Sequence, residues 1–127
     1  MSDPHPYHVD VEVEPQYVED QSDPEQGRYV FAYKVTIYNR GAIGAQLLTR
    51  HWLIEDANGK VQEVQGEGVV GEQPHLEPGQ AFQYTSWTMI ATPVGSMRGS
   101  YQMEAEDGTR FDAEIAPFSL SIPRTLH

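Results

Sequence analysis

The feature that most constrains this chain is a strict alternation in the stretch RYVFAYKVTIYN, residues 28–39. Tyr29, Phe31, Tyr33, Val35 and Ile37 occupy every second position. Successive side chains of a β-strand point to opposite faces of a sheet, whereas a helix repeats about every 3.6 residues. The pattern therefore predicts a strand with one buried face, which β-branched and aromatic residues favour.

The same two-residue period recurs along most of the chain. YHVDVEVEP, residues 7–15, predicts a half-buried first strand that ends at its proline. AQLLTRHWLIED, residues 45–56, is apolar on both faces, which is typical of a central strand. We assign Leu47 and Leu53 to one face of that strand, and Leu48, Trp52 and Ile54 to the other.

Turn residues separate the remaining strands. Asn58-Gly59 and Asp107-Gly108 are the residue pairs that tight hairpins prefer, and Pro78-Gly79 marks a further turn. The alternation after these turns predicts that Phe82, Tyr84, Ser86, Met97, Tyr101, Met103, Phe111, Ala113, Ile115, Phe118, Leu120 and Ile122 face inward. We expect RFDAEI, residues 110–115, and FSLSI, residues 118–122, to be two separate strands.

These patterns predict seven or eight short strands, turns at regular intervals and no helix longer than a turn or two. An all-β, antiparallel two-sheet β-sandwich of the immunoglobulin or fibronectin type III kind fits them, and a small closed barrel is the structural alternative. With 127 residues and no break in composition, we expect a single domain over 1–127. Its core should span about 7–123, with short mobile ends at about 1–6 and 124–127.

The charge balance restricts the partners. Eight Lys and Arg against 19 Asp and Glu give a net charge of −11, which repels nucleic-acid backbones and anionic membrane surfaces. The arginines are scattered singly, and we expect no nucleic-acid or membrane partner. The absence of cysteine and of an N-terminal secretory signal favours a cytoplasmic protein.

The segment GEGVVGEQP, residues 66–74, contains Gly66, Gly68 and Gly71 at the spacing of a dinucleotide-binding loop. Such a loop needs a helix directly after it, and Pro74 leaves no room for one. We interpret the glycines as a backbone device that permits positive φ, a bulge or a close approach. A nest of amides that receives an anion is the alternative, although Glu67 and Glu72 would oppose the anion.

The histidines do not predict a metal site. They lie at positions 5, 8, 51, 75 and 127, and only His5 and His8 are close in sequence. With Asp10, these two could bind a transition ion adventitiously near the N-terminal end. We expect no metal site and no cofactor.

No residue pattern indicates catalysis. The chain lacks a G-x-S-x-G nucleophile motif, and His51 lies mid-strand beside Trp52, where a structural role is expected. The acidic pairs Glu55-Asp56 and Glu106-Asp107 flank turns, and adjacent strand residues point to opposite faces. We therefore expect no catalytic residue and no enzymatic activity.

Several longer stretches together resemble the bacterial ApaG family, also called CorD. They are SDPEQGRYVFAYKVTIYNRG, QLLTRHWLIEDANGKVQEVQGEGVVGEQPHLEPGQAFQYTS, TPVGSMRGSYQME and DGTRFDAEIAPFSL. The resemblance covers about residues 9–123, and RHW, GEGVVGEQP and GSMRGSYQM are its most specific motifs. Trp87 in YTSWTMI departs from the family pattern, in which a small residue is expected.

The resemblance implies a fibronectin type III-like β-sandwich and an association with cobalt and magnesium resistance. It also implies a genetic setting beside a dinucleoside-tetraphosphate hydrolase. Similar domains occur as modules in eukaryotic F-box proteins and in a polymerase-delta-interacting protein. The family has no established catalytic residues, so the resemblance transfers none to this chain.

We therefore expect a non-enzymatic interaction module with a protein partner. Exposed aromatic and arginine side chains carry much of the affinity at protein interfaces, and Arg50, Trp87 and Arg98 are the candidates here. The alternative is a phosphate-, pyrophosphate- or nucleotide-binding protein that uses the amides of residues 66–71, with Arg50 or Arg98 nearby.

Overall fold

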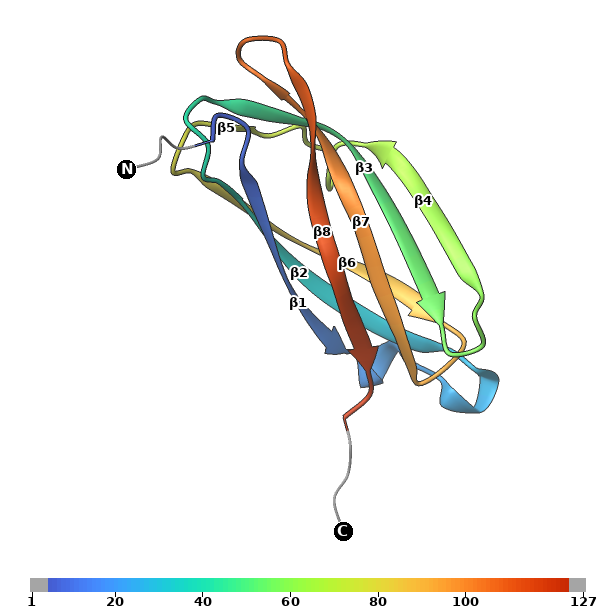
Figure 1. The fold of residues 1–127 in the computed structure, drawn as a ribbon. Helices are drawn as coiled ribbons and strands as arrows, with labels where there is room; N and C mark the ends of the chain where they lie inside the picture. The colour runs from blue at the N-terminus through green and yellow to red at the C-terminus, as the bar shows by residue number, and fades with distance from the viewer. Residues whose placement is uncertain (1–4, 124–127) are drawn as a thin grey trace.

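The computed structural model describes residues 5–123, which form two antiparallel β-sheets packed face to face (Figure 1). The predicted mobile ends lie largely outside these residues. Two short 3₁₀ turns, η1 (Glu19–Gln21) and η2 (Pro24–Gln26), follow the first strand. The strands are β1 (Val9–Tyr17), β2 (Tyr29–Asn39), β3 (Ala45–Asp56), β4 (Val61–Glu67), β5 (His75–Leu76), β6 (Ala81–Ile90), β7 (Val94–Ala105) and β8 (Arg110–Ser121).

The smaller sheet has the strand order β1-β2-β6. Its central strand β2 shows the predicted alternation, because Phe31, Tyr33, Val35 and Ile37 are buried while Tyr29 is half-buried. The register pairs Val35 with Val13 on one side and with Tyr84 on the other. The period-two prediction for this strand is confirmed.

The larger sheet has the order β4-β3-β7-β8, and the short β5 also pairs with β3. Strand β3 is central, as predicted, but its two faces were assigned wrongly. A bulge between Leu47 and Thr49 shifts the register against β7, so that Leu47 and Trp52 are both buried in the core. One extra residue in a strand moves every later side chain to the opposite face of the sheet.

The last two predicted strands form a single strand, β8, which contains an irregularity. The register between β7 and β8 shifts between Met97 and Gly99. Ile115 and Phe118 both pack on the core side, although an uninterrupted two-residue period would place them on opposite faces. The sequence therefore reads as two strands, where the structure has the single strand β8.

The core lies between the sheets and is dominated by large side chains. Trp52 and Tyr101 of the larger sheet are buried with Phe31 of the smaller one, and Met103 is buried beside them as predicted. Strands β1 and β8 contact each other along one side of the sandwich. The two-sheet sandwich is confirmed, and the closed barrel is not observed. The described residues contain no helix long and apolar enough to cross a membrane.

Candidate functional site

The side of the sandwich opposite β1 and β8 is formed by β4 and β6, the outer strands of the two sheets. Two adjoining clefts lie between these strands, with volumes of about 360 and 310 Å³. Both clefts are lined by the same four residues, Tyr33, Arg50, Trp52 and Ser86. We call this continuous feature the edge groove.

Arg50 lies in the floor of the edge groove because the bulge in β3 places it on the inner side of the sheet. Its cross-strand neighbour on β4 is Gly66. A Cβ atom on Gly66 would lie 2.8 Å from both terminal guanidinium nitrogens, so the glycine leaves the space that the arginine occupies. One of these nitrogens donates hydrogen bonds of 2.9 Å to the carbonyl oxygens of Glu67 and Gly68.

Buried tyrosines lie beneath Arg50. The hydroxyls of Tyr84 and Tyr101, from opposite sheets, share a hydrogen bond. Burial raises the pKa of Tyr84 to about 12 and also raises that of Tyr101, while the nearby positive charge of Arg50 acts in the opposite direction on both. Burial likewise raises the pKa of Tyr33, against the hydrogen bond from Ser86 and the charge of Arg50. At neutral pH the groove thus combines neutral phenols with one cation.

The rim of the edge groove is apolar and exposed. Val64 on β4 and Met89 on β6 line one cleft with Trp87, and Val70 lines the other. These are four of the six large apolar side chains that the described residues expose. Trp87 and Met89 are 56% and 51% accessible, although they lie in a strand whose inner side chains pack on the core. The rim therefore offers apolar surface to a ligand or partner.

The predicted glycine loop closes one end of the groove. Gly68 and Gly71 have φ of +63° and +82°, conformations that favour glycine. The amide of Gly68 donates to the Leu48 carbonyl, and Val69 and Glu72 exchange two backbone hydrogen bonds. The loop therefore uses these two glycines for its turn and Gly66 to accommodate Arg50, while three of its amides are engaged within the protein.

The structure brings together some of the predicted residues but not all. Arg50, Trp87 and Gly71 line the edge groove. Arg98 lies elsewhere, on the outer side of β7, where it forms a 3.4 Å ion pair with Glu55. His51 likewise faces away from the core and makes a 2.7 Å contact with Glu63.

The sequence did not identify most residues of the groove, namely Tyr33, Val64, Val70, Ser86 and Met89. A partial signal was available in β6, where Trp87 and Met89 put two large apolar residues on the face that is otherwise polar. Nothing in the local sequence indicates that β4 and β6 become outer strands on the same side. That proximity comes from the order of the strands.

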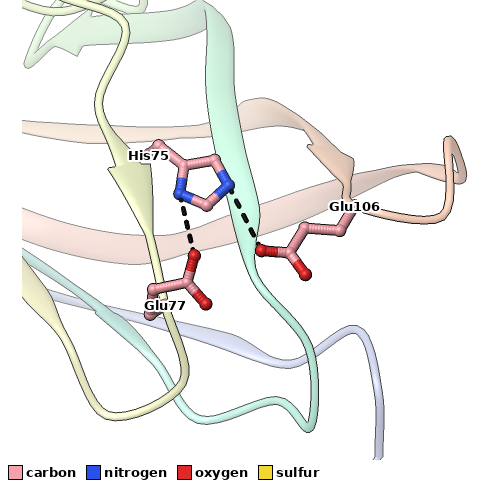
Figure 2. Close-up of side chains that lie close together, drawn as sticks. All are labelled: His75, Glu77 and Glu106. Atoms are coloured by element: carbon pink, nitrogen blue, oxygen red, sulfur yellow. Dashed lines mark ion pairs between the residues drawn. The ribbon is translucent and has the colours of Figure 1, made fainter.

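A second group of polar side chains lies at the β5 end of the larger sheet. Figure 2 shows His75 between Glu77 and Glu106, at 3.4 Å from Nδ1 and 3.6 Å from Nε2. Gly44 leaves room for the Glu106 carboxylate. Imidazole and carboxylates are ligands that divalent ions accept, but here the ring uses a different nitrogen toward each carboxylate, as in a bridging ion pair. The sequence did not predict this group, because Glu106 is distant along the chain from His75 and Glu77.

The fold and the groove define a fibronectin type III-like β-sandwich domain with one open side. The ApaG domain family model matches residues 19–105. The chain therefore belongs to the ApaG domain family, and the resemblance inferred from its motifs is confirmed.

Relatives and solved structures agree with this assignment. Protein ApaG of Methylobacillus flagellatus is 62% identical over 95% of each chain, and that of Azotobacter vinelandii is 61% identical over the whole of both chains. A crystal structure described as the putative ApaA protein from Bordetella pertussis has a TM-score of 0.94 and 51% identity. The match covers 97% of this chain and 100% of that one.

Proposed function

We propose that this protein is a non-enzymatic interaction module of the cytoplasm, which binds a partner protein through the edge groove. The observation that supports this function is that exposed apolar side chains gather around a half-buried arginine in the edge groove. Trp87, Met89, Val64 and Val70 surround the groove in whose floor Arg50 lies. Tryptophan and arginine are the side chains that most often dominate the binding energy of protein interfaces.

The arrangement favours a protein over other partner classes. Exposed apolar side chains that gather in one place, rather than singly, are typical of interaction surfaces. The net charge of −11 disfavours nucleic acid and anionic lipid. The cobalt and magnesium association that the family resemblance implies would then act through the partner rather than through a metal bound here.

Quantitative capture from a lysate of the source organism tests this proposal. The immobilised wild-type protein is compared with the double variant Trp87→Ser/Met89→Thr and with Val94→Thr. Val94 is a matched control because it is also an exposed apolar side chain but does not line the groove. We expect specific proteins that wild type and Val94→Thr retain equally and the double variant loses. Equal retention by all three would refute the proposal.

The alternative function, binding of phosphate, pyrophosphate or a nucleotide, would use Arg50 with the glycine loop. Arg50 supports it as a cation near that loop. However, the amides of Gly68, Val69 and Glu72, which an anion-binding loop would need, are engaged within the protein, and Nη1 of Arg50 already donates to the carbonyls of Glu67 and Gly68. We therefore rank this alternative second.

A further inference from the structure

We propose that the occupant of the edge groove is an extended peptide segment that adds as a strand to β6 and places a carboxylate on Arg50. The inference rests on the proposed interaction function and specifies the chemistry of the partner. It combines the free hydrogen-bonding edge of β6, the charge of the groove floor and the position of the apolar rim.

The free edge of β6 presents main-chain groups toward the groove. Strand β6 pairs with β2 on its other side. In that ladder Met89 lies opposite Val30. The Val30 N–H donates a hydrogen bond to the Ser22 hydroxyl, and the Val30 carbonyl accepts one from the Val18 N–H, both on the side away from β6. Residues that face each other in an antiparallel pair direct their main-chain groups either both inward or both outward. The Met89 main chain therefore points away from β2, into the open side.

A side-chain contact supports this orientation. Gln62 of β4 donates to the Met89 carbonyl oxygen across the groove, at 3.4 Å. Because the pattern repeats every two residues, the N–H and C=O groups of Thr85 and Trp87 point the same way. Among residues 5–123 this edge has no main-chain partner, and Gln62 engages only the Met89 carbonyl. An edge of this kind is a template for an added strand.

The groove floor adds a charge that selects the ligand. Among residues 5–123, no carboxylate lies within ion-pair distance of Arg50 or Arg28, whereas Arg40, Arg98 and Arg110 each have one. Of the two arginines without such a carboxylate, Arg50 is the one that lines the groove. Arginine binds carboxylates with paired hydrogen bonds, and such pairs are strong where water is excluded. Nη1 of Arg50 donates to the carbonyls of Glu67 and Gly68, but among residues 5–123 neither Nη2 nor Nε has a hydrogen-bond acceptor. A carboxylate from the added strand would bind at these two nitrogens and match the charge.

The surroundings restrict what flanks that carboxylate. Glu67 lines the same cleft as Arg50, and the chain as a whole is strongly acidic. A highly acidic segment would be repelled, so the fitting segment carries one Asp or Glu among apolar β-branched residues and Lys or Arg. Its side chains would alternate between the inner floor, over Trp52, and the outer rim, over Trp87 and Met89.

Selection from a display library of random linear peptides, long enough to form one strand, tests the inference on the intact protein. We expect enriched sequences with one acidic position between β-branched residues. Synthetic versions of the enriched peptides then give affinities by fluorescence anisotropy. Replacing the acidic residue with its amide should weaken binding about tenfold or more, and this change on the ligand cannot affect folding of the protein.

Two variants of the protein complete the test. Thr85→Pro removes an N–H that points to the open side, where proline is tolerated, and should abolish binding while thermal melting stays cooperative. Thr85→Ala is its matched control and should bind as wild type does. Glu67→Gln, which removes a competing negative charge, should leave binding unchanged or strengthen it.

Several results would overturn the inference. They are failure to enrich any sequence, equal affinity of the acid and amide peptides, and full binding by Thr85→Pro. A wild-type dimer in sedimentation that Thr85→Pro dissociates would assign the edge to a second copy of the chain instead. If the lysate capture still depends on Trp87 and Met89 while these peptide tests fail, the interaction function stands and the strand-addition mode is refuted.

Discussion

At the scale of single residues, Gly68 and Gly71 allow the cost of a strained backbone conformation to be measured apart from the cost of a steric collision. Both have positive φ, but a Cβ on Gly68 would collide with the Glu72 carbonyl oxygen, whereas a Cβ on Gly71 meets nothing within 4 Å. We predict that Gly71→Ala costs about 1 kcal/mol of unfolding free energy. Gly68→Ala should cost about 1–3 kcal/mol more, because the loop must also shift.

Urea unfolding of both variants and wild type measures this difference. Equal losses would show that the collision is relieved without cost, and that backbone conformation alone decides. Any effect of Gly68→Ala on partner capture should follow its loss of stability, since the glycine supports the loop rather than contacting the groove directly.

The buried tyrosine pair predicts an alkaline limit to stability. The pKa of Tyr84 is raised from 10.0 to about 12 in the folded protein, chiefly by burial, and that of Tyr101 is raised as well. A folded-state pKa above the unfolded one means that the folded protein retains the proton. The stability contributed is complete below about pH 10 and is lost as the pH rises to about 12.

Urea unfolding across this pH range should therefore show a falling midpoint. The double variant Tyr84→Phe/Tyr101→Phe removes both phenols together, so neither hydroxyl is left without its partner. We expect its midpoint to fall less steeply over the same range. An identical fall would show that these two phenols do not cause the alkaline loss.

At the scale of elements, Tyr7 attaches the segment before β1 to the β7–β8 hairpin. Its hydroxyl donates a 2.5 Å hydrogen bond to Asp107, which lowers the pKa of that carboxyl, and its ring lies 5.5 Å from that of Phe111. We predict that deleting residues 1–6 changes the unfolding free energy by less than about 0.5 kcal/mol. Tyr7→Ala in the full chain should lower the thermal midpoint, because it removes contacts to the β7–β8 hairpin.

Differential scanning calorimetry of the truncated protein, the Tyr7→Ala variant and wild type measures both effects. Loss of a cooperative transition on deleting residues 1–6 would show that this segment is needed for folding. An unchanged midpoint in Tyr7→Ala would show instead that the hairpin does not depend on the tyrosine.

The elements that the sequence predicted well are those with an uninterrupted period. In β2, Phe31 to Ile37 alternate without a break, so periodicity alone identifies the buried face. In β3 the period is broken by a bulge that carries no distinct residue type. In β8 the break falls at Ala116-Pro117, where the proline signals an irregularity but does not tell a bulge from the end of a strand. The face assignment after Leu47 was wrong for this reason, and β8 was divided in two.

The candidate groove was less predictable than the strands that build it. Arg50 and Trp87 could be singled out as residue types that bind partners, but their proximity depends on β4 and β6 being outer strands of different sheets. The role of Gly66 depends on its register with Arg50. Such relations arise between segments far apart in the chain, which a local pattern cannot encode.

At the scale of the whole molecule, the two sides of the sandwich are unequal. Contact between β1 and β8 covers one side, while the side between β4 and β6 keeps an open groove with a single central cation. The net charge of −11 surrounds that cation with a repulsive field for anions. A ligand that reaches Arg50 therefore needs contacts beyond charge, and the apolar rim can supply them.

This all-β architecture also determines whether the segment with Gly66, Gly68 and Gly71 can bind a dinucleotide. Residues 5–123 contain no α-helix, so no helix N-terminus can receive a pyrophosphate in the manner of a dinucleotide fold. Glu67 and Glu72 add negative charge at the loop. We predict no saturable binding of ATP, NAD or pyrophosphate at micromolar concentration.

Titration of the wild-type protein with each ligand, followed by the amide shifts of residues 66–72 in NMR, measures this directly. Shifts that saturate at micromolar ligand and stay confined to these residues would contradict the prediction. If the anion lies in the groove, Arg50→Gln would abolish these shifts. Arg98→Gln is the matched control, because it removes a cation from the outer side of β7. Small, linear shifts that Arg50→Gln leaves unchanged are the expected result, because three loop amides are engaged within the protein and the net charge of −11 opposes a free anion that makes no other contacts.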